Sequence, residues 1–224
     1  IDMAPLRSLG NPDISPFDNV FCATGELAPP LPPNVFAKLS DADADTKNSY
    51  VPSLSNSDLT AAAAVTGDST WYIGRSTLGF TTGKWYWEVT SSGNAMIGVE
   101  PTSEDVDRQY YNSGTAGLAT RDGKVWFGGT QVVTGQTDWT DGQTIGVAFN
   151  SEPGDANEGT LYIYINGSLA YSYASSMSST AFKKPSYAVY STWTLTFNFG
   201  ESGFSQTPPT GYKAVMNNNG ATSS

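Results

Sequence analysis

Hydrophobic and polar side chains alternate with a period of two along several stretches of this chain. The clearest stretches are residues 84–90, 144–149, 161–165 and 193–199. In the first of them Trp85, Trp87 and Val89 share one face, and Tyr86 and Glu88 lie on the other. A strand with this period buries one face, which is typical of antiparallel sheets packed face to face. Because no helical period lasts more than a turn or two, we predict an all-β chain.

Short turn motifs separate these strands. Asn-Gly at 166–167 predicts a two-residue hairpin, because both positions tolerate a positive φ. Asp-Gly at 122–123 predicts a second hairpin, and Asp-Gly at 141–142 predicts a turn into the next strand. Strands spaced by about 8–12 residues with such turns predict an antiparallel two-sheet β-sandwich.

The two ends of the chain differ from this pattern. Residues 1–34 are rich in proline, and the run at 28–33 favours an extended polyproline conformation. Four apolar side chains in this segment lack a surface of their own to bury them: Ile14, Phe17, Val20 and Phe21. We expect an extended N-terminal docking arm (1–34) that orders against a neighbouring subunit, with a flexible linker as the alternative. The sandwich is expected at 35–215, and a flexible C-terminal tail at 216–224, which is polar and low in complexity.

Charge and composition make some classes of partner unlikely. The chain has 224 residues, 14% of them charged, and a net charge of 11 − 21 = −10. Such an acidic surface repels phosphate backbones and anionic lipid, so we expect no nucleic-acid partner. No stretch approaches the length of a membrane span, and no signal peptide is expected. Since the first residue is Ile, we expect either a processed N-terminus or a start that lies elsewhere.

The residue types of the chain give little support for a catalytic site or a metal site. The chain has no His and one Cys, Cys22, which excludes a His-dependent catalytic relay, His-ligated metals and an intrachain disulfide. Asp41, Asp43 and Asp45 resemble half of a calcium loop, but Thr46 stands where glycine is needed. We therefore interpret the three aspartates as a solvated acidic loop and predict no metal and no cofactor.

Six strand motifs follow one another between residues 82 and 200. They are TGKWYWEVT (82–90), IGV (97–99), GQTIGVAF (142–149), GTLYIYING (159–167), YAV (187–189) and LTFNFG (195–200). In this order they resemble a SPRY domain over about residues 60–200. The resemblance implies a SPRY-like, concanavalin-like jelly roll. Its residues build the fold, with Gly146 leaving room on the face opposite Ile145, and so they indicate architecture rather than activity.

The segments that flank these strands are similar to those of SPRY-containing virion proteins of tailed bacteriophages. They are NVFAKLS (34–40) before the domain, and FGESGF (199–204) and PTGYKA (209–214) after it. The closing segment continues with Val215 where those relatives have Leu. The resemblance implies a structural component on the surface of a phage particle. From the apolar side chains of the arm we expect the arm to hold it to other virion proteins, and we expect an oligomer in the particle. The resemblance implies a tail fibre or adhesin for host attachment, or else a capsid decoration or fibre protein. Eukaryotic SPRY modules, by comparison, ride on ligases or channels and bind peptides.

We expect the protein to bind rather than to catalyse. Glycosidases on related sandwiches use an E-x-D-x-x-E strand, and no such motif occurs here. A glycan hydrolase with carboxylates paired across strands is the least favoured alternative. A host-cell glycan or protein remains the expected ligand.

Aromatic residues beside polar groups are the candidate ligand contacts, since flat rings stack on sugars or peptide edges. Three clusters fit, and each has an alternative role in the core. Their members are Trp71, Tyr72 and Arg75; Asp107, Arg108, Tyr110, Tyr111 and Asn112; and Asp138, Trp139 and Asp141. The second cluster is preferred, because Tyr110 and Tyr111 are adjacent and cannot both point inward. Tyr162 and Tyr164, with Tyr171 and Tyr173 on the next strand, predict a tyrosine-rich outer sheet that contacts another subunit or is covered by loops.

Overall fold

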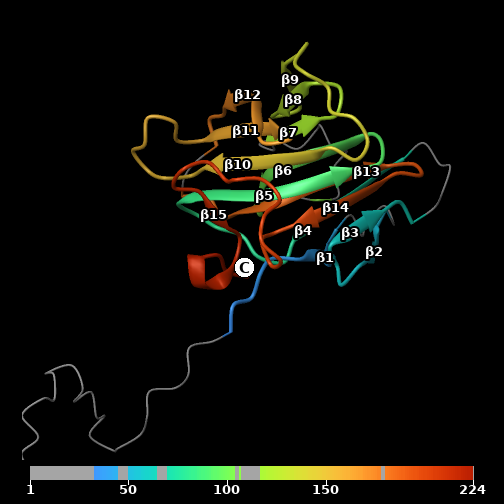
Figure 1. Cartoon of the computed structure of the whole chain (residues 1–224), viewed down its shortest axis with the longest axis horizontal. Helices are drawn as coiled ribbons and strands as arrows, with labels where there is room; N and C mark the ends of the chain where they lie inside the picture. Colours follow the sequence, from blue (N-terminus) through green and yellow to red (C-terminus); the bar gives the residue numbers. More distant parts are fainter. Residues whose placement is uncertain are drawn as a thin grey trace, which may run out of the picture. The chain divides into compact units, whose positions relative to one another are not determined.

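The computed structural model describes residues 33–44, 50–64, 70–103, 106, 117–177 and 180–223. From Asn34 onward the chain forms one compact unit of two β-sheets packed face to face (Figure 1). The predicted antiparallel β-sandwich is confirmed. The arm residues Ile14, Phe17, Val20 and Phe21 lie outside the described residues, and docking by this arm stays a prediction.

One sheet has seven strands in the order β1-β4-β13-β6-β7-β8-β9, with every neighbouring pair antiparallel. Its strands are β1 (Leu39–Ala44), β4 (Trp71–Ser76), β6 (Ala95–Pro101), β7 (Gly117–Thr120), β8 (Lys124–Phe127), β9 (Thr130–Val133) and β13 (Lys183–Tyr190). The turn at Asp122-Gly123 joins β7 to β8 with Gly123 at φ 64°, as the hairpin prediction required.

The other sheet has eight strands, seven of them in the order β12-β11-β10-β5-β14-β3-β2. Its strands are β2 (Ser53–Ser55), β3 (Thr60–Ala62), β5 (Lys84–Ser91), β10 (Thr144–Asn150), β11 (Thr160–Ile165), β12 (Ser168–Ala174), β14 (Thr194–Asn198) and β15 (Lys213–Ala214). The short β15 pairs in parallel with Trp85 and Tyr86 of β5, beside the part of β5 that β14 does not cover. Asn166 and Gly167 both have a positive φ in the β11–β12 turn, which confirms the predicted hairpin.

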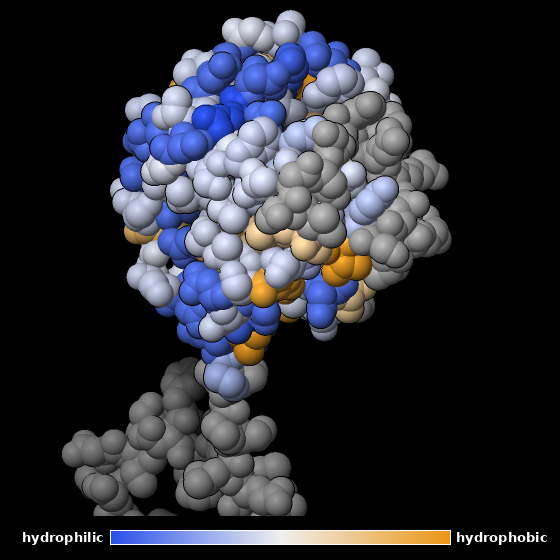
Figure 2. All heavy atoms as spheres, turned by 90° about the vertical axis from the view of Figure 1, so that its right-hand side faces the viewer, coloured by the Kyte–Doolittle hydropathy of each residue, from blue (hydrophilic) through white to orange (hydrophobic). Residues whose placement is uncertain are grey.

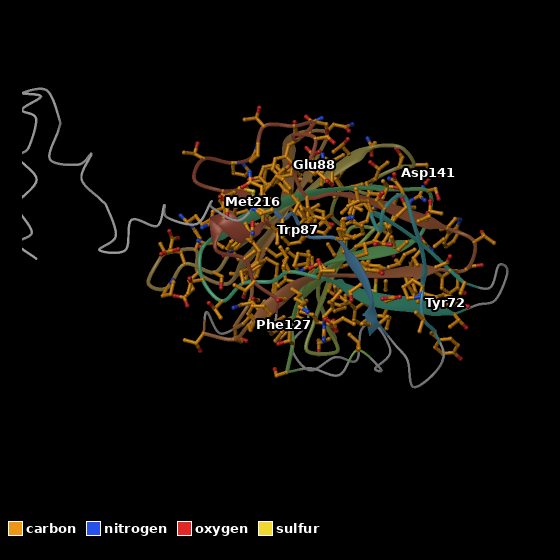
Figure 3. The ribbon with its side chains drawn as sticks, turned by 90° about the horizontal axis from the view of Figure 1, so that it is seen from below. Tyr72, Trp87, Glu88, Phe127, Asp141 and Met216 are labelled. Atoms are coloured by element: carbon orange, nitrogen blue, oxygen red, sulfur yellow. The ribbon has the colours of Figure 1, made fainter. Side chains whose placement is uncertain are left out.

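The core fills the space between the two sheets. Trp85, Trp87 and Val89 of β5 are at most 1% exposed and face the core, whereas Glu88 lies on the opposite side of the strand (Figure 3). Phe80 stacks on Trp85 with ring centroids 4.9 Å apart. The period-two prediction therefore gave the buried face of β5 correctly.

The tyrosines of β11 and β12 do not form one outer surface. Tyr171 pairs with Ile163 and Tyr173 pairs with Leu161, and both partners face the core. Tyr171 is only 6% exposed. The tyrosine-rich outer sheet is thus reduced to Tyr162 and Tyr164, because cross-strand partners share a face.

The C-terminal segment is held to the sandwich, contrary to the flexible tail predicted at 216–224. Phe36 bridges Met216, and the Val35 amide donates to the Asn217 side-chain oxygen at 2.9 Å. Asn217–Asn219 form a 3₁₀-helix, and Thr222 exchanges backbone hydrogen bonds with Gly79. Ala221 is 1% exposed. The two segments on either side of the SPRY-like strands therefore pair with each other, which local polarity does not reveal. Among the described residues no helix is long and apolar enough to span a membrane.

Candidate functional site

The outer face of the seven-stranded sheet carries the candidate site. Tyr72 and Phe127 belong to the core cluster, so their neighbours Trp71 on β4 and Trp126 on β8 lie on the opposite, outer side. Both tryptophans are half-buried and line a pocket of about 150 Å³. Its other lining residues are Asn94, Ala95, Thr120, Arg121, Asp122 and Lys124. We call this the tryptophan pocket.

An apolar base lies beside the pocket. Ile73 pairs with Ala188, Ala188 with Met96, and Leu118 with Trp126, so these side chains form neighbouring rows across the outer face. Ile73, Met96, Leu118 and Ala188 are at most 3% exposed and form a hydrophobic cluster separate from the main core. This cluster holds Trp71 and Trp126 in place from below, because both rings pack against it.

An aromatic row continues from the pocket towards the end of the sheet. The Trp71 and Tyr190 ring centroids are 4.9 Å apart, and those of Tyr190 and Trp193 are 5.6 Å apart. All three side chains are half-buried. Rings that expose one side while packing with the other can contact a ligand without rearranging, at a low cost in side-chain entropy.

Charged groups at the rim of the pocket are fixed by ion pairs. Arg121 lies 2.6 Å from the Asp141 carboxylate, and its Nε donates to the Trp139 carbonyl at 3.2 Å. Lys124 pairs with Asp122 across the hairpin turn. Partial burial alone would raise the pKa of Asp122, but hydrogen bonds from Lys124 and Thr120 outweigh it and lower that pKa below its usual value. The rim therefore presents both signs of charge at neutral pH.

A buried ionic network lies on the same outer face, nearer the β1 edge. Arg75 Nε donates to Glu100 Oε2 at 3.1 Å, and both side chains are about 97% buried. Asp43 Oδ1 accepts from Arg75 at 3.3 Å, and its Oδ2 accepts from Lys184 at 2.9 Å. Ser186 also donates to Glu100, at 3.0 Å. The interpretation of Asp43 as part of a solvated loop is wrong, since it lies in β1 and joins two buried cations.

The outer face of the eight-stranded sheet is covered by the chain itself. Glu88, 3% exposed, accepts hydrogen bonds from the Ser205 amide (2.9 Å), the Ser205 hydroxyl (3.0 Å) and the Gln206 amide (2.7 Å). Asn198 donates a fourth at 3.0 Å. We call residues 199–206 the Glu88-bound loop.

Aromatic contacts hold the same covering segment. Phe204 packs edge-on against Tyr86 with centroids 4.9 Å apart, and Tyr212 packs edge-on against Tyr162 at 6.2 Å. Gly146 makes room for Tyr86, because a Cβ at position 146 would lie 2.5 Å from the Tyr86 hydroxyl. This confirms the role predicted for Gly146. Tyr86 and Glu88 therefore serve the fold.

The structure places the site residues predicted from the sequence in different environments. Trp71 lines the tryptophan pocket, and its role as a ligand contact stays a prediction. Tyr72 and Trp139 are each 1% exposed, so they belong to the core and offer no surface to a ligand. Trp139 instead positions the rim through Arg121, and its indole donates to Ser91 at 3.0 Å. The preferred cluster of Arg108, Tyr110, Tyr111 and Asn112 lies outside the described residues, and its role stays a prediction.

Sequence reasoning missed Trp126, Tyr190, Arg121 and Lys124 as site residues. The signal was present for Trp126, because Val125 and Phe127 on either side of it in the sequence pack towards the core. An outward tryptophan between two inward residues indicates a surface with a function.

The arrangement provides recognition chemistry. The two buried glutamates, Glu88 and Glu100, are engaged by several donors each, and both hold structure together. Within the described part of the chain no three His, Cys, Asp or Glu side chains are grouped to hold a metal ion.

Comparison with known proteins identifies the architecture. No family model matches the chain, and no curated protein matches it either. Solved structures do: the SPRY domain of human HERC1 superposes with a TM-score of 0.53 and 17% identity, over 71% of this chain and 96% of that domain. The fold is that of a SPRY domain. The PSpry domain of TRIM65 gives a TM-score of 0.55 at 14% identity, over 73% of this chain and 90% of that one.

Stonustoxin is a third similar structure, with a TM-score of 0.54 and 16% identity. The match covers 73% of this chain but only 27% of stonustoxin, so the two share a domain rather than a whole architecture. At these identities the comparisons show the fold alone. None of these three structures is described as a bacteriophage protein, so the predicted place in a virion draws no support from them.

Proposed function

We propose that this protein is a non-enzymatic binding module, which recognises a segment of a partner protein on the outer face of its seven-stranded sheet. The observation that carries the proposal is the tryptophan pocket, whose half-buried Trp71 and Trp126 pack against a buried apolar cluster. Tryptophan and arginine dominate the binding energy of protein interfaces, particularly where a side chain enters a pocket surrounded by polar groups.

The pocket accepts one side chain of the partner rather than a whole cofactor. Its volume of about 150 Å³ is well below that of a typical cofactor site, which is roughly 300–1,000 Å³. Arg121, Asp122 and Lys124 then orient the flanking backbone of the partner through charge-assisted hydrogen bonds. The SPRY fold supports this function, since SPRY modules bind peptides.

Selection of peptides from a random display library on the immobilised full chain tests the proposal. Enriched peptides should lose at least about tenfold in affinity on Trp71→Ala. The matched control is Tyr164→Ala, a half-buried aromatic on the outer face of the other sheet, and it should leave affinity unchanged. Peptides that bind Trp71→Ala as tightly as the original chain would contradict the proposal.

A second candidate function is attachment of a phage particle to host glycan. Two observations favour it: the flanking segments similar to those of phage virion proteins, and the row of Trp71, Tyr190 and Trp193, whose rings suit successive sugars. A glycan array separates the two functions. Binding to defined glycans that is lost on Trp193→Ala supports attachment, and detection of the chain in purified particles by mass spectrometry would support its place there.

A further inference from the structure

The two lateral sides of the sandwich end in very different strand edges. On one side lie β1, which carries Asp41 and Asp43, and β2, which has only three residues. Charged residues and short strands are the devices by which proteins protect a sheet edge from pairing with another chain. On this side, therefore, the edge strands are unsuited to pairing with another chain.

The opposite side ends in β12 and β9, and it lacks that protection. β12 has seven residues and contains neither a charged residue nor proline. Within the described part of the chain it pairs only with β11. Leu169 on this strand is 55% exposed, more than any other large hydrophobic side chain among the described residues. β9 is the edge strand of the seven-stranded sheet, where β8 is its only partner among the described strands, and its Val132 is 37% exposed.

These two edges lie next to each other. Phe127 on β8 contacts Tyr173 on β12 across the core, with ring centroids 5.9 Å apart. Figure 1 shows β8, β9, β11 and β12 together at the top of the molecule. One side of the sandwich thus presents the edges of both sheets.

The side formed by β9 and β12 lacks charged residues, although the protein as a whole is acidic. No Asp, Glu, Lys or Arg occurs from Gly159 to Phe182, nor from Val125 to Thr137. The chain as a whole carries a net charge of −10, so two copies repel each other over most of their surfaces. A neutral edge is the place where a second copy approaches at the lowest electrostatic cost.

From these observations we propose that β12 is a self-association edge, on which a second copy of this chain pairs its own β12 in antiparallel orientation. An antiparallel edge is complementary to itself about a two-fold axis perpendicular to the sheet, which is the symmetry of most homodimers. The register shift near Ile163 and Tyr164 lies towards the hairpin turn. Tyr171–Ala174 therefore remain regular and open for pairing.

The proposed dimer leaves the tryptophan pockets of both copies accessible. The two-fold axis turns the outer faces of the two seven-stranded sheets to the same side, and neither face is covered by pairing at the edge. A partner that presents two binding segments would then engage both pockets at once, which raises its overall affinity.

Sedimentation velocity of the full chain over about a hundredfold range of concentration tests the proposal. We expect a dimer, and we expect Leu169→Lys to weaken it by at least about tenfold, because lysine on an edge strand opposes pairing. The control is Val35→Lys, which makes the same change in charge at a position 49% exposed outside β12. It should leave the dimer unchanged.

Each other outcome overturns the proposal: a monomer at all concentrations, a dimer that Leu169→Lys does not weaken, or a dimer that Val35→Lys weakens equally. Hydrogen exchange gives a second measurement that needs no variant. The amides of residues 168–174 should exchange more slowly as the concentration of the chain rises, and exchange independent of concentration would also overturn the proposal. Because these measurements require no ligand, they are independent of the tryptophan pocket.

Discussion

The two outer faces of this sandwich are used in opposite ways. On the eight-stranded sheet, Glu88 and Tyr86 bind the Glu88-bound loop, so the chain covers its own surface. On the seven-stranded sheet, an apolar cluster supports two half-buried tryptophans that line a pocket. On the side shown in Figure 2, the coloured residues range mostly from hydrophilic to neutral, and hydrophobic residues are limited to small areas. The same period-two strands thus produce one face that stabilises the domain and one face on which we propose that recognition takes place.

The largest expected effect comes from Arg75→Met, which would leave Glu100 charged and buried on the seven-stranded side. We expect the free energy of unfolding to fall by about 4 kcal/mol in urea denaturation, since breaking a buried ion pair costs about 3–5 kcal/mol. The control is Lys84→Met, because the Lys84–Asp155 pair is partly exposed. It should cost far less, because solvent screens a surface ion pair. Equal losses for the two variants would show that the network contributes no more than a surface pair.

Glu88→Ala tests how the other face is closed. It leaves the Ser205 and Gln206 amides without their acceptor, and we expect a loss of about 3 kcal/mol in the free energy of unfolding. Binding at the tryptophan pocket should be unchanged. Glu201→Ala removes an exposed carboxylate of the same loop and serves as the control. If ligand affinity fell with Glu88→Ala, the separation between the two faces would be wrong.

The pH dependence of the free energy of unfolding tests the state of Lys183 inside the sandwich. Lys183 is fully buried, its Nζ donates to the carbonyls of Thr81 and Ala181, and burial lowers its pKa from 10.5 to about 8. Between pH 8 and 10.5 the unfolded chain binds more protons at this residue than the folded chain, so stability rises with pH. From pH 7.5 to 9.5 the original chain should gain about 2 kcal/mol relative to Lys183→Met. A constant difference between the two would contradict a lowered pKa.

The smallest expected change in stability belongs to Trp71→Ala. The ring is half-buried and packs on the outer apolar cluster rather than in the main core, so its loss should cost only about 1–2 kcal/mol of unfolding free energy. Thermal unfolding measures this directly. A loss above about 4 kcal/mol, as for a core tryptophan, would mean that Trp71 serves mainly the fold.

The sequence predicts the fold well because the fold rests on local patterns. Alternation in β5 and the Asn166-Gly167 turn are properties of neighbouring residues, and both predictions are confirmed. The site depends on partners far along the chain: Trp71 meets Tyr190, and Asp43 meets Lys184. The inward direction of Tyr171 likewise follows from its pairing with Ile163. Such contacts are set by sheet order, which the sequence pattern alone does not reveal.

The indole N–H resonances of the six tryptophans provide the most direct test of recognition at the tryptophan pocket. Nuclear magnetic resonance spectra of the ¹⁵N-labelled chain would be recorded as a display-selected peptide is added. We predict that the Trp71 and Trp126 signals shift, while those of buried Trp85, Trp87 and Trp139 stay in place. Unchanged Trp71 and Trp126 signals, together with shifts of backbone amides in the Glu88-bound loop, would place recognition on the other face and contradict the proposed function.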